Sequence, residues 1–278
     1  MSAQMPRQLS EKHTIDYHRD GVICIRNCVS EADVELLRRE IARTLDEKTS
    51  SYVNHTARNS GTRGAFEMAF KIWENNDTLA NFACGSHLPA VAAALMESSK
   101  INLLFDQCFV KQPQTDDPTP WHNDQPFWPI KGDQVITLWI ALDYLTRESS
   151  ALEFVRASHR WNRWIQPMNF SGENKFSINP KFEQGIDIEG NRDEYDIISW
   201  DLAPGDVLAF HGMNLHGAPA NTTKNVLRRA YAIRYTGADV VYDPHLGSTA
   251  TLLQDELFEG SPLDSSHFPV VWQNFEPG

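Results

Sequence analysis

Apolar residues recur at helical spacing in the first hundred residues of the chain. Ser30 is followed three positions later by Asp33, as at the start of a helix with a capping box. The apolar residues on one face of the following helix are Val34, Leu37, Ile41 and Leu45. A second helical segment is predicted over residues 76–98, and the apolar run at residues 21–25 predicts a short strand. Residues 1–100 are therefore expected to form a mostly helical flank with one early strand.

From about residue 101 the pattern changes to short apolar segments separated by Gly, Pro, Asn and Asp. These segments are residues 101–110, 135–142, 152–155, 206–210 and 229–235. Their length and spacing predict antiparallel strands of a sandwich or barrel. A polar stretch at about 162–196 interrupts them, and such a loop inside a compact domain is often a lid or binding loop. We expect one domain over residues 1–278, with a β core at 101–240 and a C-terminal extension at 241–278.

Composition and charge narrow the classes of partner. The chain of 278 residues has a formal net charge of −12, which argues against non-specific nucleic-acid binding, since phosphate contacts need clustered Lys and Arg. No apolar run approaches the ~20 residues that span a bilayer, and the N-terminus lacks a secretory stretch. Four scattered cysteines are too few for a disulfide framework. We expect a cytoplasmic protein, a monomer or homodimer, with a small-molecule partner and no membrane partner.

The segment Trp121–Trp128 contains a candidate pair of metal ligands. Residues two apart on an extended strand project to the same side, so His122 and Asp124 can offer an imidazole nitrogen and a carboxylate oxygen to one ion. In a chain with ten histidines, this spacing also arises by chance. The pair alone is therefore equally compatible with a surface or capping role.

A second segment, residues 204–235, strengthens the prediction of a metal site. A Gly-Asp turn leads into an apolar strand, and both His211 and His216 are then followed by Gly. A histidine facing the first pair would complete two imidazoles and one carboxylate. Such a set occupies one face of an octahedral ferrous ion and leaves three positions for a bidentate oxo acid and dioxygen.

Together these segments resemble the phytanoyl-CoA dioxygenase family, and the match covers about residues 15–235. The matching motifs, in the family's order, are Asp16-Tyr17-His18-Arg19-Asp20-Gly21, Trp121-His122-Asn123-Asp124, Trp139-Ile140-Ala141-Leu142-Asp143, Ala157-Ser158-His159-Arg160-Trp161 and the second segment. The resemblance implies a mainly β fold with flanking α-helices, a double-stranded β-helix of the jelly-roll, cupin-like type. It also implies a dioxygenase with Fe(2+) and 2-oxoglutarate as cofactors, acting on a small molecule and O2 and releasing succinate and CO2.

The resemblance assigns roles to particular residues. His122, Asp124 and His216 resemble the iron ligands, because the family places its second histidine ahead of the small-residue, Pro and Asn stretch, which disfavours His211. Arg228 resembles the arginine that pairs with the distal carboxylate of 2-oxoglutarate. Strand alternation sends Arg229 to the opposite face, so only one of the two can reach the cofactor. We favour Arg228.

Weaker assignments concern the surroundings of the oxo acid. Thr137 and Trp139 match positions near 2-oxoglutarate in the family, although ordinary strand packing would also explain them. Lys111, on the strand before the first ligand pair, is a further candidate for cofactor binding. Ala218 departs from the family, since many members have there a serine that donates a hydrogen bond to the oxo acid. His159 is expected to be a structural histidine in a turn.

The substrate is the least determined part of the prediction. Phe127 and Trp128 are expected to line the mouth of the pocket, with Trp161 or Trp164 added from the loop, or else to belong to the core. Coenzyme A thioesters are disfavoured by the acidic chain. Asp124 favours hydroxylation, because related halogenases lack this carboxylate. Two alternatives stay open: the same cofactors used for desaturation, epimerisation or ring formation, and a non-iron cupin-like binding protein.

Overall fold

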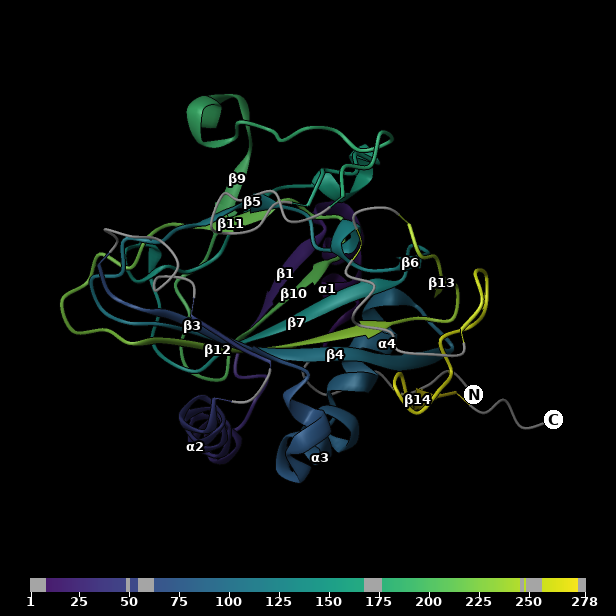
Figure 1. Ribbon diagram of the computed structural model, residues 1–278, viewed down its shortest axis with the longest axis horizontal. Helices are drawn as coiled ribbons and strands as arrows, with labels where there is room; N and C mark the ends of the chain where they lie inside the picture. The colour runs from purple at the N-terminus through teal and green to yellow at the C-terminus, as the bar shows by residue number, and fades with distance from the viewer. Residues whose placement is uncertain are drawn as a thin grey trace.

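The computed structural model is rich in β-strands, with helices along one side (Figure 1). It describes residues 9–48, 51–54, 63–167, 177–245, 248 and 257–274. The α-helices of this part of the chain are α1 (Glu11–Asp20), α2 (Glu31–Glu47), α3 (Asp77–Gly85) and α4 (Leu88–Met96). The 3-10 helices are η2 (Ile72–Asn75), η3 (Gln125–Phe127), η4 (Arg147–Ser149), η5 (Ser158–Trp161) and η6 (Glu189–Glu194).

The strands form two principal sheets. In chain order they are β1 (Val22–Ile25), β2 (Tyr52–Asn54), β3 (Phe66–Phe70), β4 (Lys100–Lys111), β5 (Thr119–His122), β6 (Ile130–Lys131), β7 (Val135–Ala141), β8 (Glu153–Val155), β9 (Ile197–Ser199), β10 (Val207–His211), β11 (His216–Ala218), β12 (Arg228–Thr236), β13 (Val241–Tyr242) and β14 (Val270–Gln273). The larger sheet has the order β1-β10-β7-β12-β4-β3-β2, with β14 also paired to β4, and the smaller has the order β5-β11-β8-β9. Neighbouring strands that are far apart in the chain, such as β1 and β10, are typical of a jelly roll. The predicted double-stranded β-helix is confirmed.

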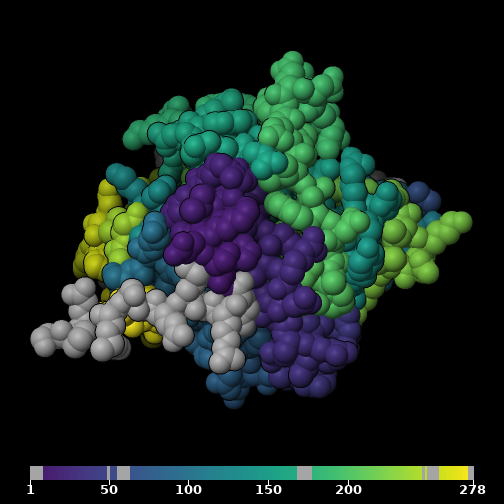
Figure 2. Space-filling model, turned by 180° about the vertical axis from the view of Figure 1, so that it is seen from behind, coloured from purple at the N-terminus to yellow at the C-terminus, as the bar shows by residue number. Residues whose placement is uncertain are grey.

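Helices cover one face of the larger sheet. On β12, Tyr231, Ile233 and Tyr235 point to this side and pack with residues of α2, α3 and α4 in one apolar cluster. Figure 1 shows α2 and α3 below this sheet, and Figure 2, which shows the molecule from behind, has the purple segment with α1 at the front. Tyr17 of α1 belongs to the same apolar cluster. The predicted cap of α2 is confirmed, because Ser30 Oγ accepts a hydrogen bond from the backbone N–H of Asp33 at 3.1 Å.

The other face of the larger sheet is directed toward the smaller sheet. Here the alternate residues of β12, Ala230 and Ala232, belong to a second apolar cluster with Phe154 of β8 and Ala218 of β11. Figure 1 shows β5, β11 and β9 above the larger sheet. Strand alternation therefore divides β12 into a face packed against helices and a face that lines the layer between the two sheets.

Two expectations about the elements need correction. The helical segment predicted over residues 76–98 is two helices, since α3 ends at Gly85 and α4 starts at Leu88. Pro89 lies in the first turn of α4, where a missing N–H costs nothing. The N-terminal flank contributes three strands rather than one, because β3 pairs with the long strand β4, and β2 pairs with β3. These short strands have no clear pattern of their own and depend on tertiary pairing.

The segment Asp77–Met96, which contains α3 and α4, is long and apolar enough by composition to cross a membrane. The expectation that no such run exists was therefore too strict. In the structure, 56% of the apolar window is buried, and Leu79, Leu88 and Val91 lie in the cluster between the helices and the larger sheet. Packing against this sheet accounts for the apolar composition of the segment.

The polar stretch predicted at about 162–196 lies beside the smaller sheet. Its described residues include η6 and a bridge between Ile165 and Glu183, and residues 168–176 lie outside the described part of the chain. In Figure 2 the green segment that contains η6 projects from the top of the molecule. In the C-terminal extension, β13 pairs with β6 and β14 pairs with β4, so both are tied to the strands before them.

Candidate metal centre

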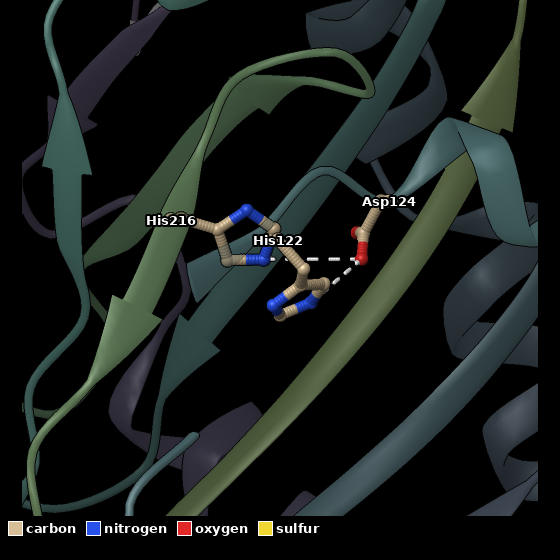
Figure 3. Close-up of side chains that lie close together, drawn as sticks. All are labelled: His122, Asp124 and His216. Carbon is tan, nitrogen blue, oxygen red and sulfur yellow. Dashed lines mark ion pairs between the residues drawn. The ribbon is translucent and has the colours of Figure 1, made fainter. Parts of the chain in front are cut away.

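His122, Asp124 and His216, hereafter the triad, converge in the layer between the sheets (Figure 3). His122 ends β5 and His216 begins β11, and the two are direct partners in the antiparallel register of the smaller sheet. Asp124 follows two residues later, just ahead of η3. Cross-strand partners have neighbouring side chains, so the pairing of β5 with β11 brings together two histidines that are distant in the sequence.

The potential ligand atoms of the triad surround one point. Asp124 Oδ1 lies 3.4 Å from His122 Nε2 and 3.8 Å from His216 Nε2, and the imidazole centroids are 4.3 Å apart. The ligand atoms offered by the three residues all lie within 4.8 Å of one another. Two imidazole nitrogens and one carboxylate oxygen in this arrangement match the two-histidine, one-carboxylate face of a ferrous ion. In the described part of the chain, this is the group that meets the geometric conditions for a metal site.

Both imidazoles have their tautomer set by the backbone. His122 Nδ1 lies 2.7 Å from the carbonyl oxygen of Pro120, and His216 Nδ1 lies 3.0 Å from that of Asn214. A carbonyl only accepts, so each Nδ1 carries the hydrogen and each Nε2 is left with a lone pair directed to the triad centre. Burial, together with nearby His122, lowers the pKa of His216 to about 4, which keeps its ring neutral at neutral pH.

The two oxygens of Asp124 have different surroundings. Oδ1 faces the imidazoles, whereas Oδ2 accepts a hydrogen bond from Thr137 Oγ1 at 3.2 Å and lies 3.9 Å from Arg234 Nη2. Burial by itself would raise the pKa of Asp124, but the interactions of its carboxylate with His122, His216 and Arg234 outweigh it and hold the pKa below its usual value. The carboxylate is therefore ionised and available to a cation.

Polar side chains outside the triad hold its loops in place. Ser158 Oγ donates to Asn214 Oδ1 and accepts from the backbone N–H of Leu215, both at 2.8 Å, which fixes the turn before His216. Asn123, between the first two triad residues, points away from the centre and donates to the carbonyl of Arg163 at 2.8 Å. This bond ties the ligand segment to the polar insertion.

A second polar site lies at the start of β12, where Arg228 and Lys111 of β4 are cross-strand partners. Both are essentially buried, with 1% and 0% of their surface exposed. Lys111 Nζ contacts Thr119 Oγ1 at 3.2 Å and Ser150 Oγ at 3.1 Å, while Arg228 Nε donates to the carbonyl of Ser150 at 3.2 Å. Burial lowers the pKa of Arg228 to about 9 and, with the charge of Arg228, also lowers the pKa of Lys111.

This cation pair, Arg228 and Lys111, has the features of an anion site. Among the described residues, Arg228 Nη1 has no hydrogen-bond partner, although it is buried. Two buried cations side by side repel each other and are stabilised by an anion that accepts hydrogen bonds from both. The distal carboxylate of 2-oxoglutarate fits this donor set.

The structure separates the two neighbouring arginines as strand alternation predicts. Arg229 faces the helices and binds Asp143 through Nε at 3.0 Å and Nη2 at 2.6 Å, whereas the guanidinium of Arg228 lies 4.9 Å from the centroid of the Trp139 ring. Only Arg228 is directed into the layer that contains the triad. This geometry supports Arg228 and Trp139 as cofactor residues, and their roles stay predictions.

Other predicted residues have mixed surroundings. The hydroxyl of Thr137 is directed to Asp124, which favours a positioning role over the predicted contact with the oxo acid. Ala218 is the cross-strand partner of Thr119 in the pairing of β11 with β5. Ala218 itself has no hydroxyl group, but its neighbour Thr119 carries one. His211 lies outside the triad, with Nε2 at 3.4 Å from Asp133 Oδ1, and the metal site is completed by His216 instead.

The aromatic residues proposed for the substrate divide into two groups. The ring of Phe127 meets that of His122 edge-on, with centroids 5.8 Å apart, which places it at the metal centre. Trp128 is almost fully buried and packs against Phe105, so packing explains most of its surface. In the insertion, Trp161 is partly exposed, and the ring of Trp164 lies near Phe182 and His245, at 5.4 and 5.6 Å between centroids. The substrate roles remain predictions.

Sequence reasoning missed two residues of this region, Ser150 and Arg234. Ser150 lies in a turn with a positive φ of 72°, and no pattern in its segment connects it to Lys111. Arg234 carried a usable signal, because it stands six positions after Arg228 on one predicted strand. An even separation places two strand residues on the same face.

Known proteins resemble this chain over most of its length. A family model described as phytanoyl-CoA dioxygenase matches residues 17–230. A protein of Caenorhabditis elegans named "Probable phytanoyl-CoA dioxygenase" is 25% identical over 272 residues, which cover 90% of this chain and 83% of that protein.

Solved structures share the fold at lower identity. The carbocyclase SnoK from nogalamycin biosynthesis is 20% identical with a TM-score of 0.74, covering 98% of this chain and 100% of that one. The epimerase SnoN from the same biosynthesis is 22% identical with a TM-score of 0.72, covering 94% and 98%. EctD from S. alaskensis, solved with 2-oxoglutarate and 5-hydroxyectoine, is 16% identical with a TM-score of 0.65, covering 85% and 79%.

Proposed function

Since the chain belongs to the phytanoyl-CoA dioxygenase family, we propose that it hydroxylates a small organic molecule at the triad, with Fe(II), 2-oxoglutarate and O2. Family membership itself supports the more general statement that the chain is a 2-oxoglutarate-dependent dioxygenase with iron as its cofactor. It also argues against the non-iron binding protein that the sequence left open. Hydroxylation and the residue roles are the proposed part.

One observation supports this proposal above all others. Three side chains from β5, the following turn and β11 bring two Nε2 atoms and one carboxylate oxygen to a single point, and backbone carbonyls hold both Nδ1 atoms. When bound, iron and 2-oxoglutarate supply the activation of dioxygen, with succinate and CO2 as co-products. The triad would hold the metal on one side and leave the opposite side for the reactants.

The other residues would position and shield these groups. Arg228 and Lys111 would bind the distal carboxylate of 2-oxoglutarate, with Trp139 against the guanidinium. Thr137 would keep Oδ2 of Asp124 turned away from the metal. The sheet layer around them is apolar, which excludes water from the reacting centre and strengthens each of these charged contacts.

A second candidate function keeps the cofactors and changes the outcome of the reaction. Two proteins of the same fold, SnoN and SnoK, are named for epimerisation and carbocycle formation and not for hydroxylation. The same centre could therefore serve an oxidation of the substrate without insertion of oxygen. At 20–22% identity these neighbours support the fold and leave the reaction to experiment.

The test is iron-dependent consumption of 2-oxoglutarate by the purified protein across a panel of small organic substrates. We expect succinate to form only when Fe(II), 2-oxoglutarate and O2 are all present, and a substrate to accelerate its formation. The mass of the product then distinguishes the two candidates: a gain of one oxygen indicates hydroxylation, whereas a loss of two hydrogens or an unchanged mass indicates the second. Failure to form succinate under any of these conditions would exclude both.

A further inference from the structure

We propose that Arg234 binds a carboxylate of the substrate, so that the molecules oxidised at the triad are small organic acids with an apolar body. This inference rests on the proposed function, because it names the class of substrate for the same centre. It concerns a residue whose role is not explained by the metal or by 2-oxoglutarate.

The position of Arg234 on β12 separates it from Arg228, the proposed site of the distal carboxylate of 2-oxoglutarate. Arg228, Ala230, Ala232 and Arg234 alternate on the face of the strand that lines the layer between the sheets. Six residues of an antiparallel strand span about 20 Å. The distal carboxylate of 2-oxoglutarate, held at Arg228, therefore cannot also reach Arg234, and the other carboxylate would be neutralised by the metal that it binds.

The guanidinium of Arg234 is buried without a full set of partners. Only 5% of the residue is exposed, and its Nε and Nη1 have no hydrogen-bond partner among the described residues. The carboxylate near it, Asp124, lies 3.9 Å from Nη2, which is beyond hydrogen-bonding distance. A buried charged group with open donors is unfavourable unless a ligand completes its bonds.

A structural arginine on the same strand shows what complete pairing looks like. Arg229 binds both oxygens of Asp143 through Nε and Nη2, at 3.0 and 2.6 Å. Arg234 has no comparable partner, although the planar fork of arginine is suited to bidentate binding of a carboxylate. Orientation of Asp124 does not account for Arg234 either, since Thr137 already donates to the same oxygen at 3.2 Å.

The surroundings of Arg234 indicate what kind of acid would bind. Its guanidinium lies 4.8 Å from the ring centroid of Phe105, 5.7 Å from that of Phe109 and 5.9 Å from that of Trp128. These rings offer apolar surface and no acceptor for the open donors, which favours a carboxylate attached to a hydrocarbon or aryl group. The single contact with Asp124 places that acid beside the metal centre.

Metal binding would strengthen the attraction for an anion. The negative charge that faces Arg234 at close range belongs to Asp124, a predicted metal ligand. When a divalent cation binds this carboxylate, the negative charge of the carboxylate no longer balances the positive charge of the guanidinium. The region between the metal and Arg234 then has an excess of positive charge, which a substrate carboxylate would neutralise.

Calorimetric binding of matched probes tests the proposal. The protein is loaded anaerobically with Fe(II) and saturated with 2-oxoglutarate, so that the anion site at Arg228 is occupied. Phenylacetate, hexanoate and octanoate are then titrated, each beside the primary amide of the same skeleton. We expect at least one acid to bind at least about tenfold more tightly than its amide. Equal affinity within every pair would overturn the proposal.

Two variants locate the effect. Arg234→Gln is expected to abolish the preference for the acid, whereas Arg229→Gln, which removes a paired charge on the opposite face of the strand, is expected to leave it unchanged. A preference that survives Arg234→Gln would contradict the assignment. Equal weakening of acid and amide in this variant would also contradict it, because that result indicates a purely structural arginine.

A third measurement does not depend on how the variants fold. In crystals of the wild-type holoprotein with 4-bromophenylacetate, anomalous scattering from bromine locates the probe. The carboxylate is expected within hydrogen-bonding distance of Arg234, and a probe bound elsewhere would overturn the proposal. Binding of iron and 2-oxoglutarate is titrated beforehand, and this distinguishes failure of the two proposals. If iron or 2-oxoglutarate does not bind, the proposed function is rejected. If both bind normally but acids are not preferred, only the role of Arg234 is rejected.

Discussion

The two faces of β12 carry similar polar residues but differ in how many of these residues have hydrogen-bond partners within the protein. Toward the helices, Arg229 is paired with Asp143 and the hydroxyl of Tyr231 donates to Asp106 at 2.5 Å. Toward the smaller sheet, Arg228 and Arg234 are more deeply buried than Arg229, yet Nη1 of Arg228 and both Nε and Nη1 of Arg234 have no partner in the described part of the chain. On the first face, these polar groups are paired within the protein. On the second face, we expect ligands to supply the partners.

This difference shows how buried charged side chains that stabilise the fold can be distinguished from those that bind ligands. A buried charge costs free energy unless it is paired, so a fold that leaves donors open gives up stability at that point. Such sites are expected where the protein binds something. The predictions that follow perturb one face at a time, because a functional face and a structural face should respond in different measurements.

The largest effect is expected at the triad. Asp124→Ala removes the one carboxylate of the metal site, so iron binding and product formation should fall to background. His211→Ala is the matched control, since this histidine lies in the same region but outside the triad. Anaerobic titration with Fe(II), followed by assay of succinate, measures both. Full turnover by Asp124→Ala would refute the ligand assignment.

A smaller effect is expected at the cation pair. Arg228→Gln removes the charged donor proposed for the distal carboxylate of 2-oxoglutarate, a bond worth about 1.5–3 kcal/mol. The KM for 2-oxoglutarate should therefore rise by roughly 10- to 100-fold, while iron binding without the oxo acid stays intact. Initial rates at varied 2-oxoglutarate concentration provide the measurement. An unchanged KM would assign the cofactor to another residue.

On the helix face, Asp106 should affect the pH dependence of stability and not the chemistry. Burial raises the pKa of Asp106 from 3.8 to about 6, although the hydrogen bond from Tyr231 opposes the shift. Between these values the native state keeps a proton that the unfolded chain releases, so stability is greatest at low pH and falls as the pH rises through this window.

Asp106→Asn should remove this contribution. Across the window, the free energy of unfolding of the wild type should fall by on the order of 3 kcal/mol relative to the variant. Denaturant unfolding of both proteins at several pH values checks this, with 2-oxoglutarate consumption as the control for an intact site. A wild type that gained stability relative to the variant over the same range would show that the sign is wrong.

The smallest effect is expected from Arg229→Gln. Its ion pair with Asp143 is partly exposed, so its loss should lower the free energy of unfolding by about 1 kcal/mol. The KM for 2-oxoglutarate should stay close to the wild-type value, in contrast to Arg228→Gln. If the two variants raised this KM equally, the division of β12 into a structural and a functional face would not hold.

Much of the site was predictable because its residues obey simple spacing. Strand alternation correctly separated Arg228 from Arg229. His122 and Asp124 were found by their spacing and the family resemblance, but the strand expected to carry both ends at His122, and Asp124 lies in the turn before η3. The choice of His216 over His211 came from the resemblance, since both are followed by Gly. In the structure, only His216 is paired in register with His122.

The rest depended on tertiary contacts that no local pattern reports. β2 and β3 become strands by pairing along β4, and the break between α3 and α4 leaves the apolar pattern of that segment continuous. Thr137 was placed near 2-oxoglutarate by resemblance, whereas the structure directs its hydroxyl to Asp124. Side-chain partners across strands are set by register, which a single sequence does not encode in short patterns.

The most direct test of the account is anomalous diffraction at the iron edge from crystals grown anaerobically with Fe(II) and 2-oxoglutarate. One peak is predicted per chain, coordinated by Nε2 of His122, Nε2 of His216 and Oδ1 of Asp124, with the oxo acid extending toward Arg228. An iron peak at other side chains, or no peak in protein that forms succinate, would contradict it.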